Sequence, residues 1–253
     1  MRAAIFARLA LVEAWRGGLP WIVLASVALA LGLGAYLGQL ALTEGRLLQT
    51  AVVAAVLRAC AAFIVAAQVV ASVQREIAAK GLELMLSLPL TRPAQYVGRL
   101  AGFAACGVLL ACVFALPLAL WAPPLALAGW TLSLVCELVL VAAAALFFGM
   151  SLRQPVSALA ATAGFYLLAR SVSAMQAIAA GPLVDETLAH QIARRAIDGV
   201  ALAMPALDGA TRTEWLLYGI GDWRAYALAL GGVLVYAVLL AAAGVFDFAR
   251  RAA

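Results

Sequence analysis

The stretch QREIAAKGLELMLSLPLTRPAQYVGR, residues 74–99, lies between two long apolar runs and decides how the rest of the chain is interpreted. It holds the only lysine of the sequence, Lys80, together with Glu76 and Glu83. Arginines flank these residues, and large apolar side chains occupy its middle, namely Leu82, Leu84, Met85, Leu86 and Leu88. This mixture of charge, proline and apolar side chains predicts a short exposed segment between two membrane spans, which we call the 74–99 segment.

The composition of the whole chain is that of a membrane protein. Of its 253 residues, 67% are hydrophobic and 11% are charged, and the mean hydropathy is +1.06. A water-soluble domain with this balance would have too little polar surface to cover its core. The net charge of +5 comes mainly from arginines that flank apolar runs, so it does not indicate nucleic-acid binding.

Six windows are long enough to cross a membrane, since a helical span needs about 20 apolar residues for about 30 Å of hydrocarbon. They are residues 19–41, 50–73, 98–121, 129–150, 155–177 and 225–249. Backbone groups in lipid must be satisfied within their own segment, so each window is predicted to be a helix. We therefore predict an all-α integral membrane protein with one domain over residues 1–253.

The distribution of arginine and lysine predicts the orientation, because these residues favour the cytoplasmic side in short loops. With both termini inside, the cytoplasmic set is Arg2, Arg8, Arg16, Arg75, Lys80, Arg92, Arg99, Arg153, Arg250 and Arg251. The outer set is smaller, and most of it lies in one long loop. The lack of asparagine and the single lysine are typical of a GC-rich bacterial genome, so we expect a bacterial inner membrane.

Two further elements are expected outside the spans. Apolar residues alternate with arginines over residues 1–18, which favours an interfacial helix on the inner leaflet. In the long extracytoplasmic loop, 178–224, Asp185 is a candidate cap for a helix that runs to about Ala203 and ends before Pro205. A second short element is expected at 213–218. This loop is either a lid resting on the lipid headgroups or a surface for substrate or a periplasmic partner.

The sequence lacks the common signatures of catalysis and of metal binding. G-x-x-x-x-G-K-[ST], H-E-x-x-H and G-x-S-x-G are all absent. His190 is the only histidine, and the four cysteines fall inside spans with no C-x-x-C spacing. We therefore predict no catalytic residue, no metal site and no cofactor bound by this chain.

The 74–99 segment resembles the first cytoplasmic loop of the type-2 ABC transporter permeases, the ABC-2 family. The residues that carry the resemblance are Arg75, Glu76, Gly81, Glu83, Leu86, Ser87, Leu88, Pro89, Leu90, Arg92, Tyr96, Gly98 and Arg99. Leu82 departs from the threonine that many members have after the glycine. Permeases of this family have six spans, an N-terminal interfacial helix and a coupling helix in this loop that enters a cleft on a separate ATPase subunit.

The resemblance implies that the chain is the permease subunit of an ABC transporter, an exporter. It implies that ATP and Mg²⁺ are bound by the partner ATPase, that this chain is not an enzyme, and that it forms a homodimer or a heterodimer with a similar permease in the lipid bilayer. The expected coupling residues are Glu76, Gly81, Leu82, Glu83, Met85, Leu86, Pro89 and Arg92.

The residues of the segment suit a coupling helix for physical reasons as well. Leu82, Met85 and Leu86 share a helical face that would fill a groove, and the flanking charges would set the register. A loop that only anchors the chain would explain the arginines but not the two glutamates. The other function that stays open is a non-transporting membrane component of an ATPase-driven metal or cofactor maturation or envelope complex. Ion-driven transport is less favoured, because few acidic residues lie in the spans.

Three charged residues, Arg58, Glu137 and Arg170, interrupt spans two, four and five. A rise of about 1.5 Å per residue puts all of them in the outer half of the membrane. An unpaired charge there costs at least about 2.5–3.5 kcal/mol, so we predict that Glu137 pairs with one arginine and leaves the other to face the pathway or an anionic headgroup. The cluster is either part of the substrate route or an ion pair that holds the helices together.

Small residues in the first and fifth spans are candidates for helix contacts. Gly34 and Gly38 have the G-x-x-x-G spacing that lets two helix backbones approach closely. The fifth span carries Ala158, Ala160, Ala161, Ala163 and Gly164. These residues predict a contact between two permease domains, with packing inside one protomer as the alternative.

Overall fold

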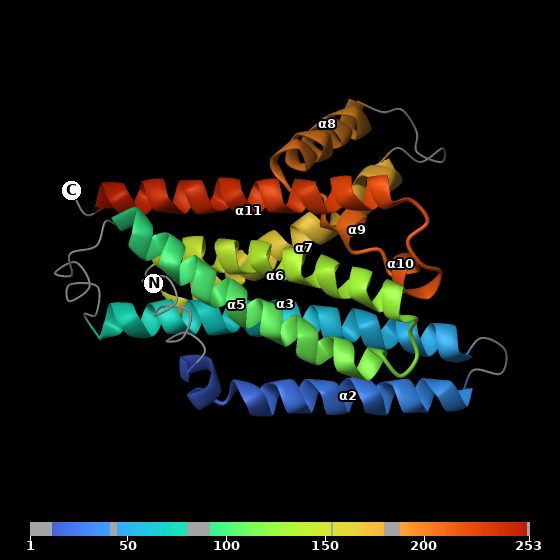
Figure 1. Ribbon diagram of the computed structural model, residues 1–253. Helices are drawn as coiled ribbons and strands as arrows, with labels where there is room; N and C mark the ends of the chain where they lie inside the picture. The colour runs from blue at the N-terminus through green and yellow to red at the C-terminus, as the bar shows by residue number, and fades with distance from the viewer. Residues whose placement is uncertain (1–11, 41–44, 80–91, 153, 180–187, 252–253) are drawn as a thin grey trace.

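The computed structural model describes residues 12–40, 45–79, 92–152, 154–179 and 188–251. Within these ranges the chain is almost entirely helical and has no strand. Six helices are long and apolar enough to cross a membrane, and they form one bundle (Figure 1). For the described residues the prediction of an all-α protein with six long apolar helices is confirmed, and this architecture supports a multi-pass membrane protein.

The bounds of the helices follow the predicted windows but extend beyond them. The long helices are α2 (Leu19–Leu40), α3 (Gly45–Ala78), α5 (Arg92–Leu118), α6 (Pro124–Ser151), α7 (Pro155–Ala179) and α11 (Trp223–Arg251). Three short helices, α8 (Leu188–Ala203), α9 (Leu207–Ala210) and α10 (Glu214–Leu217), lie between α7 and α11. The 34 residues of α3 span about 51 Å at about 1.5 Å per residue. This exceeds about 30 Å of hydrocarbon, so in a bilayer α3 would extend beyond the hydrocarbon core.

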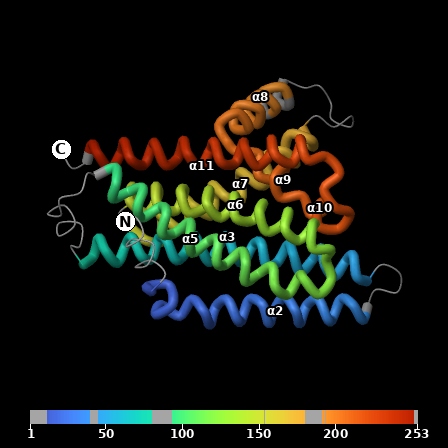
Figure 2. Tube along the Cα trace, in the orientation of Figure 1, coloured from blue at the N-terminus to red at the C-terminus, as the bar shows by residue number. Residues whose placement is uncertain are grey.

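Helix α6 is the centre of the bundle, because it packs against α3, α5, α7 and α11. Five consecutive residues of α6, Ala142 to Leu146, are completely buried, and four of them are alanines. Small side chains let neighbouring helices approach closely where no hydrophobic effect drives them together. Helix α2 lies at the edge of the bundle and packs mainly on α3 (Figure 2).

Prolines mark the starts of two of these helices. Pro123 is extended, with φ −61° and ψ 145°, and precedes Pro124 at the first position of α6. Pro155 begins α7, where its missing N–H breaks no helical hydrogen bond. Pro117 lies one residue before the end of α5.

The N-terminal region is tied to α3. Residues 12–16 form a helical turn, and Gly18, at φ +83°, turns the chain into α2 in a conformation that favours glycine. Glu13 in this turn accepts hydrogen bonds from Ser72 (2.7 Å) and Arg75 (2.8 Å) on α3. Residues 12–16 of the stretch expected to form an interfacial helix are therefore a helical turn anchored to the bundle, while residues 1–11 lie outside the described residues.

The region between α7 and α11 contains the expected helical elements. Helix α8 ends at Ala203, before Pro205, while Asp185 lies outside the described residues. Helix α8 lies on the outside of the bundle, and Tyr236 in the middle of α11 donates a hydrogen bond to the carbonyl of Leu202 (3.1 Å; Figure 1). Trp215 of α10, in the short element expected at 213–218, packs edge-on against Tyr226 of α11 at 4.9 Å between ring centroids.

Candidate functional site

The three intramembrane charges meet at one point inside the bundle. Arg58 on α3 donates from Nη1 to Oε2 of Glu137 on α6 at 2.6 Å. Arg170 on α7 donates from Nη1 to the other oxygen, Oε1, at 3.1 Å. Glu137 therefore pairs with both arginines, whereas the sequence led us to expect a pair with only one. One carboxylate joins three helices, the consecutive α6 and α7 and the more distant α3.

Two further side chains of α6 hold Arg58 in place. Ser133 accepts a hydrogen bond from Nη2 of Arg58 at 2.8 Å and donates to the carbonyl of Trp130 at 2.9 Å. The guanidinium of Arg58 lies 5.2 Å from the centre of the Trp130 ring, within range of a cation–π interaction. Trp130, Ser133 and Glu137 are spaced by three and four residues, so they share one helix face. That spacing is the signal in the sequence that would have identified Trp130 and Ser133.

Tyr166 completes the site from α7. Its hydroxyl donates to Oε1 of Glu137 at 2.9 Å and accepts from Nη1 of Arg170 at 3.3 Å. Tyr166 is one helical turn before Arg170, and Phe63 of α3 packs edge-on against its ring. Sequence reasoning missed Tyr166, although its spacing of four residues from Arg170 was a signal of the same kind.

The charges of the site are not balanced and are not equally buried. The side chains of Arg58 and Glu137 are 3% and 1% exposed, whereas that of Arg170 is 33% exposed. Two guanidinium cations and one carboxylate leave one positive charge in excess. Both hydrogen bonds of Arg170 within the described residues use Nη1, so its remaining nitrogens can contact a ligand. The site therefore combines a buried ion pair with a cation that can attract an anion.

A second polar layer joins the helix ends beside the 74–99 segment. Glu76 near the end of α3 pairs with Arg99 of α5 at 2.5 Å, and the Glu76 side chain is 26% exposed. Gln74 donates to the carbonyls of Gly149 and Leu152, both at 2.9 Å, at the end of α6. The segment therefore begins and ends on helices that are held together by polar contacts.

The other predicted site residues are the coupling residues and the two glycines of the G-x-x-x-G pair. Gly81, Leu82, Glu83, Met85, Leu86 and Pro89 lie outside the described residues, and Arg92 is the first residue of α5. Gly34 packs on α3 of the same chain, where an added Cβ would lie 2.7 Å from Cγ2 of Val53. A Cβ on Gly38 would lie 3.4 Å from Gln49, also on α3. The structure thus places the G-x-x-x-G face in a contact within one protomer, the alternative considered for these glycines.

Fold and site together define a helical, multi-pass membrane protein with a polar cluster in its interior. Within the described part of the chain, no group of three histidine, cysteine, aspartate or glutamate residues could hold a metal ion. No protein-family model matches the chain, and a search of curated proteins found no match either. The resemblance to ABC-2 permeases therefore depends on the residues of the 74–99 segment and on the expected topology.

Proposed function

We propose that this chain is the permease subunit of an ABC transporter of the ABC-2 type, an exporter driven by ATP hydrolysis on a separate subunit. The observation that carries the proposal is the cluster of Arg58, Glu137 and Arg170 inside six apolar helices. Charged side chains at such positions are costly, and they are used for ion pairs or for substrate pathways. The partial exposure of Arg170 favours a pathway for a substrate with an anionic group.

The ion pair at the base of the 74–99 segment suggests how an ATPase would act on this cluster. Glu76 and Arg99 join α3 to α5, so a push on the segment would displace both helices together. Arg58 lies on the same helix as Glu76, about 27 Å away at about 1.5 Å per residue. Its partner Glu137 lies on α6. A displacement of α3 against α6 would therefore change the Arg58–Glu137 contact.

The proposed setting is a bacterial inner membrane with both termini in the cytoplasm and two permease domains per transporter. The end of α3, the start of α5 and the end of α11 lie at one end of the bundle (Figure 1), which supports a common side for the 74–99 segment and the C-terminus. Small exposed residues on α7, Ala160 and Gly164, offer a surface on which two helices could approach closely.

Charge substitutions in the 74–99 segment test the proposed coupling. Glu83→Arg and Leu86→Asp are each expected to abolish co-purification of the ATPase subunit and its stimulated hydrolysis, because they place a wrong charge in the docking face. The matched control for Glu83→Arg is Glu214→Arg, the same charge reversal at an exposed residue of α10 far from the segment. ATPase binding and hydrolysis that stay at the wild-type level in both segment variants would refute the coupling.

The complex of this chain with the ATPase subunit also distinguishes the proposed transport function from the alternative, a non-transporting component of a maturation or envelope complex. Arg170→Gln removes the excess cation of the cluster and leaves the 74–99 segment unchanged, so ATPase binding should persist while hydrolysis in membranes changes. An ATPase that binds this variant and hydrolyses ATP at the wild-type rate favours the non-transporting component of a maturation or envelope complex.

Cysteine crosslinking tests the assembly. In a variant without the four native cysteines, Gly164→Cys on the exposed face of α7 should form a crosslink between two copies of the chain. Ala158→Cys on the same helix is the control, since Ala158 is completely buried and should not react. Crosslinking by neither variant, together with a monomeric mass in mild detergent, would contradict a contact through α7.

A further inference from the structure

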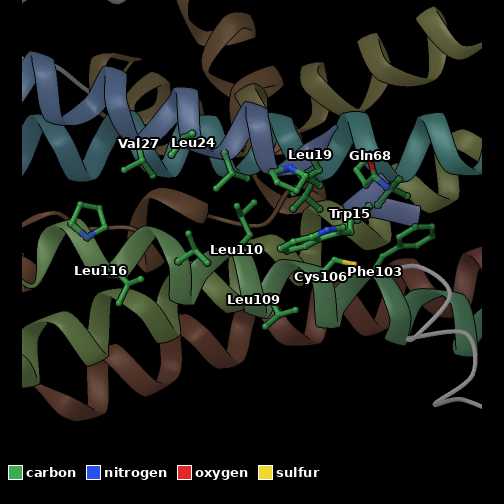
Figure 3. A pocket seen from close by; sticks show the side chains of 17 residues that line it. Trp15, Leu19, Leu24, Val27, Gln68, Phe103, Cys106, Leu109, Leu110 and Leu116 are labelled. Atoms are coloured by element: carbon green, nitrogen blue, oxygen red, sulfur yellow. The ribbon is translucent and has the colours of Figure 1, made fainter. Parts of the chain in front are cut away.

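An elongated pocket lies between α2, α3, α5 and the N-terminal turn, away from the charge cluster (Figure 3). Its volume is about 480 Å³, within the range of about 300–1,000 Å³ that is typical of small-molecule sites. The residues of α5 that line it run from Phe103 to Pro117, which corresponds to about 21 Å along the helix. The pocket is therefore long and follows the direction of the helices.

The two ends of the pocket differ in chemistry. Trp15, Gln68 and Cys106 gather at one end, while Val27 and Leu116 lie at the other (Figure 3). Among the described residues that line the pocket, Gln68 is the only one with an amide or charged side chain. A ligand that fills the pocket must be apolar over most of its length and polar at the end beside Gln68.

Gln68 supplies an unused hydrogen-bond donor at this end. Its side-chain nitrogen Nε2 is buried and has no hydrogen-bond partner within the described residues. A buried donor without a partner loses the hydrogen bonds of water and gains none in exchange. Because Nε2 is enclosed in this conformation, the Gln68 side chain must turn toward the pocket before it can donate to a ligand acceptor, such as a carbonyl oxygen.

Basic side chains lie just beyond the polar end. Gln68, Ser72 and Arg75 follow one another on one face of α3, and Arg75 is mostly exposed although it contacts Glu13. Arg16, next to Trp15 in the N-terminal turn, is also exposed. Tryptophan favours the membrane interface, and arginines beside it attract the phosphates of lipid headgroups. These side chains favour a membrane surface at the polar end of the pocket.

We propose that the pocket binds one acyl chain of a glycerophospholipid from that leaflet. The chain lies along α5 toward Leu116, its ester carbonyl accepts the hydrogen bond from Nε2 of Gln68, and its phosphate lies near Arg16 and Arg75. The proposal depends on the membrane location of the bundle and is independent of the proposed transport function.

Filling the pocket is the first test, with phosphatidylglycerol titrated onto the purified full chain in mild detergent and bound lipid counted by native mass spectrometry. Leu24→Trp places a large ring in the lining of the pocket from α2, and the matched control is Leu29→Trp, on the same helix but outside the lining. The two leucines are similarly exposed, 59% and 64%, so both variants should fold. We expect one lipid per wild-type chain, a loss of about tenfold or more in affinity for Leu24→Trp, and no change for Leu29→Trp.

The carbonyl contact is tested with a second lipid that has the same headgroup but ether-linked chains, which lack the ester carbonyl. Wild-type protein should bind the ester lipid about 3- to 10-fold more tightly than the ether lipid, since one hydrogen bond distinguishes them. Gln68→Leu keeps the volume and should remove this preference.

Four results would overturn the proposal. The first is equal lipid binding by the Leu24→Trp and Leu29→Trp variants. The second is wild-type protein that binds the ester and ether lipids equally well. The third is a free fatty acid, which has no phosphate, that binds as tightly as phosphatidylglycerol. The fourth is a change of oligomeric state in Leu24→Trp without a change in bound lipid, because the pocket would then be a protein interface.

Discussion

The Glu137→Gln substitution is expected to destabilise the bundle by about 3–5 kcal/mol, the usual effect of removing one partner of a buried ion pair. The shape of the side chain stays nearly the same, but Arg58, which is 3% exposed, loses the carboxylate 2.6 Å from its Nη1. Two cations then face each other with no acidic group between them. Thermal unfolding of the purified protein in detergent, followed by circular dichroism, measures the loss.

Two double variants show which arginine causes that loss. Glu137→Gln with Arg58→Gln should recover most of the stability, because no buried charge is left in the cluster. Glu137→Gln with Arg170→Gln should recover much less, since the Arg170 side chain is 33% exposed and stays hydrated without its partner. Two results would mean that the Arg58–Glu137 pair does not hold the helices together. One is equal recovery of stability in the two double variants, and the other is a Glu137→Gln variant as stable as the wild type.

Gly244→Ala is expected to destabilise the protein by about 1–3 kcal/mol through overpacking. Gly244 on α11 faces the ring of Tyr96 on α5, and an added Cβ would overlap Oη and Cζ and lie 3.0 Å from Cε2. Tyr96 is fully buried, so its ring has little room to move away. The unfolding temperature of the variant in detergent measures the effect. A lower unfolding temperature for Gly244→Ala, but not for a glycine substitution elsewhere on α11, would identify the α5–α11 contact as tightly packed.

The control for this prediction is Gly232→Ala on the same helix, where an added Cβ meets no atom within 4 Å. It should be neutral or stabilise the helix by about 0.5–1 kcal/mol, because alanine loses less conformational entropy than glycine. Tyr96→Leu should restore stability to Gly244→Ala, whereas Tyr96→Phe should not, because Cζ of the ring remains. Similar losses at both glycines, or rescue by Tyr96→Phe, would contradict the packing explanation.

The six long helices could be predicted because the signal is local. Each span is a continuous apolar run, and a run of that length is hidden from water only by a core or a bilayer. The predicted bounds of the spans were less accurate at the polar ends of the helices. Helix α3 begins at Gly45 instead of residue 50, and α5 begins at Arg92 instead of 98. Hydropathy follows the hydrocarbon core, whereas a helix can continue into the headgroup layer.

The charge cluster was predicted only in part. The cost of an unpaired charge in lipid indicated that Glu137 needs a basic partner, and it identified Arg58 and Arg170 as the candidates. It did not reveal that Glu137 serves both arginines, or that Tyr166 and Ser133 complete the site. Those contacts depend on how α3, α6 and α7 are rotated about their own axes, which no single span specifies.

The sequence by itself determined the class of the protein, the number of long helices and the need to neutralise the intramembrane charges. Each of these follows from the free energy of one segment in water or lipid. The tertiary structure alone decided that Gly34 packs on α3, that Glu76 pairs with Arg99, and that a pocket opens beside Gln68. These features arise where faces of different helices meet, and such contacts are set by side-chain packing across the whole bundle.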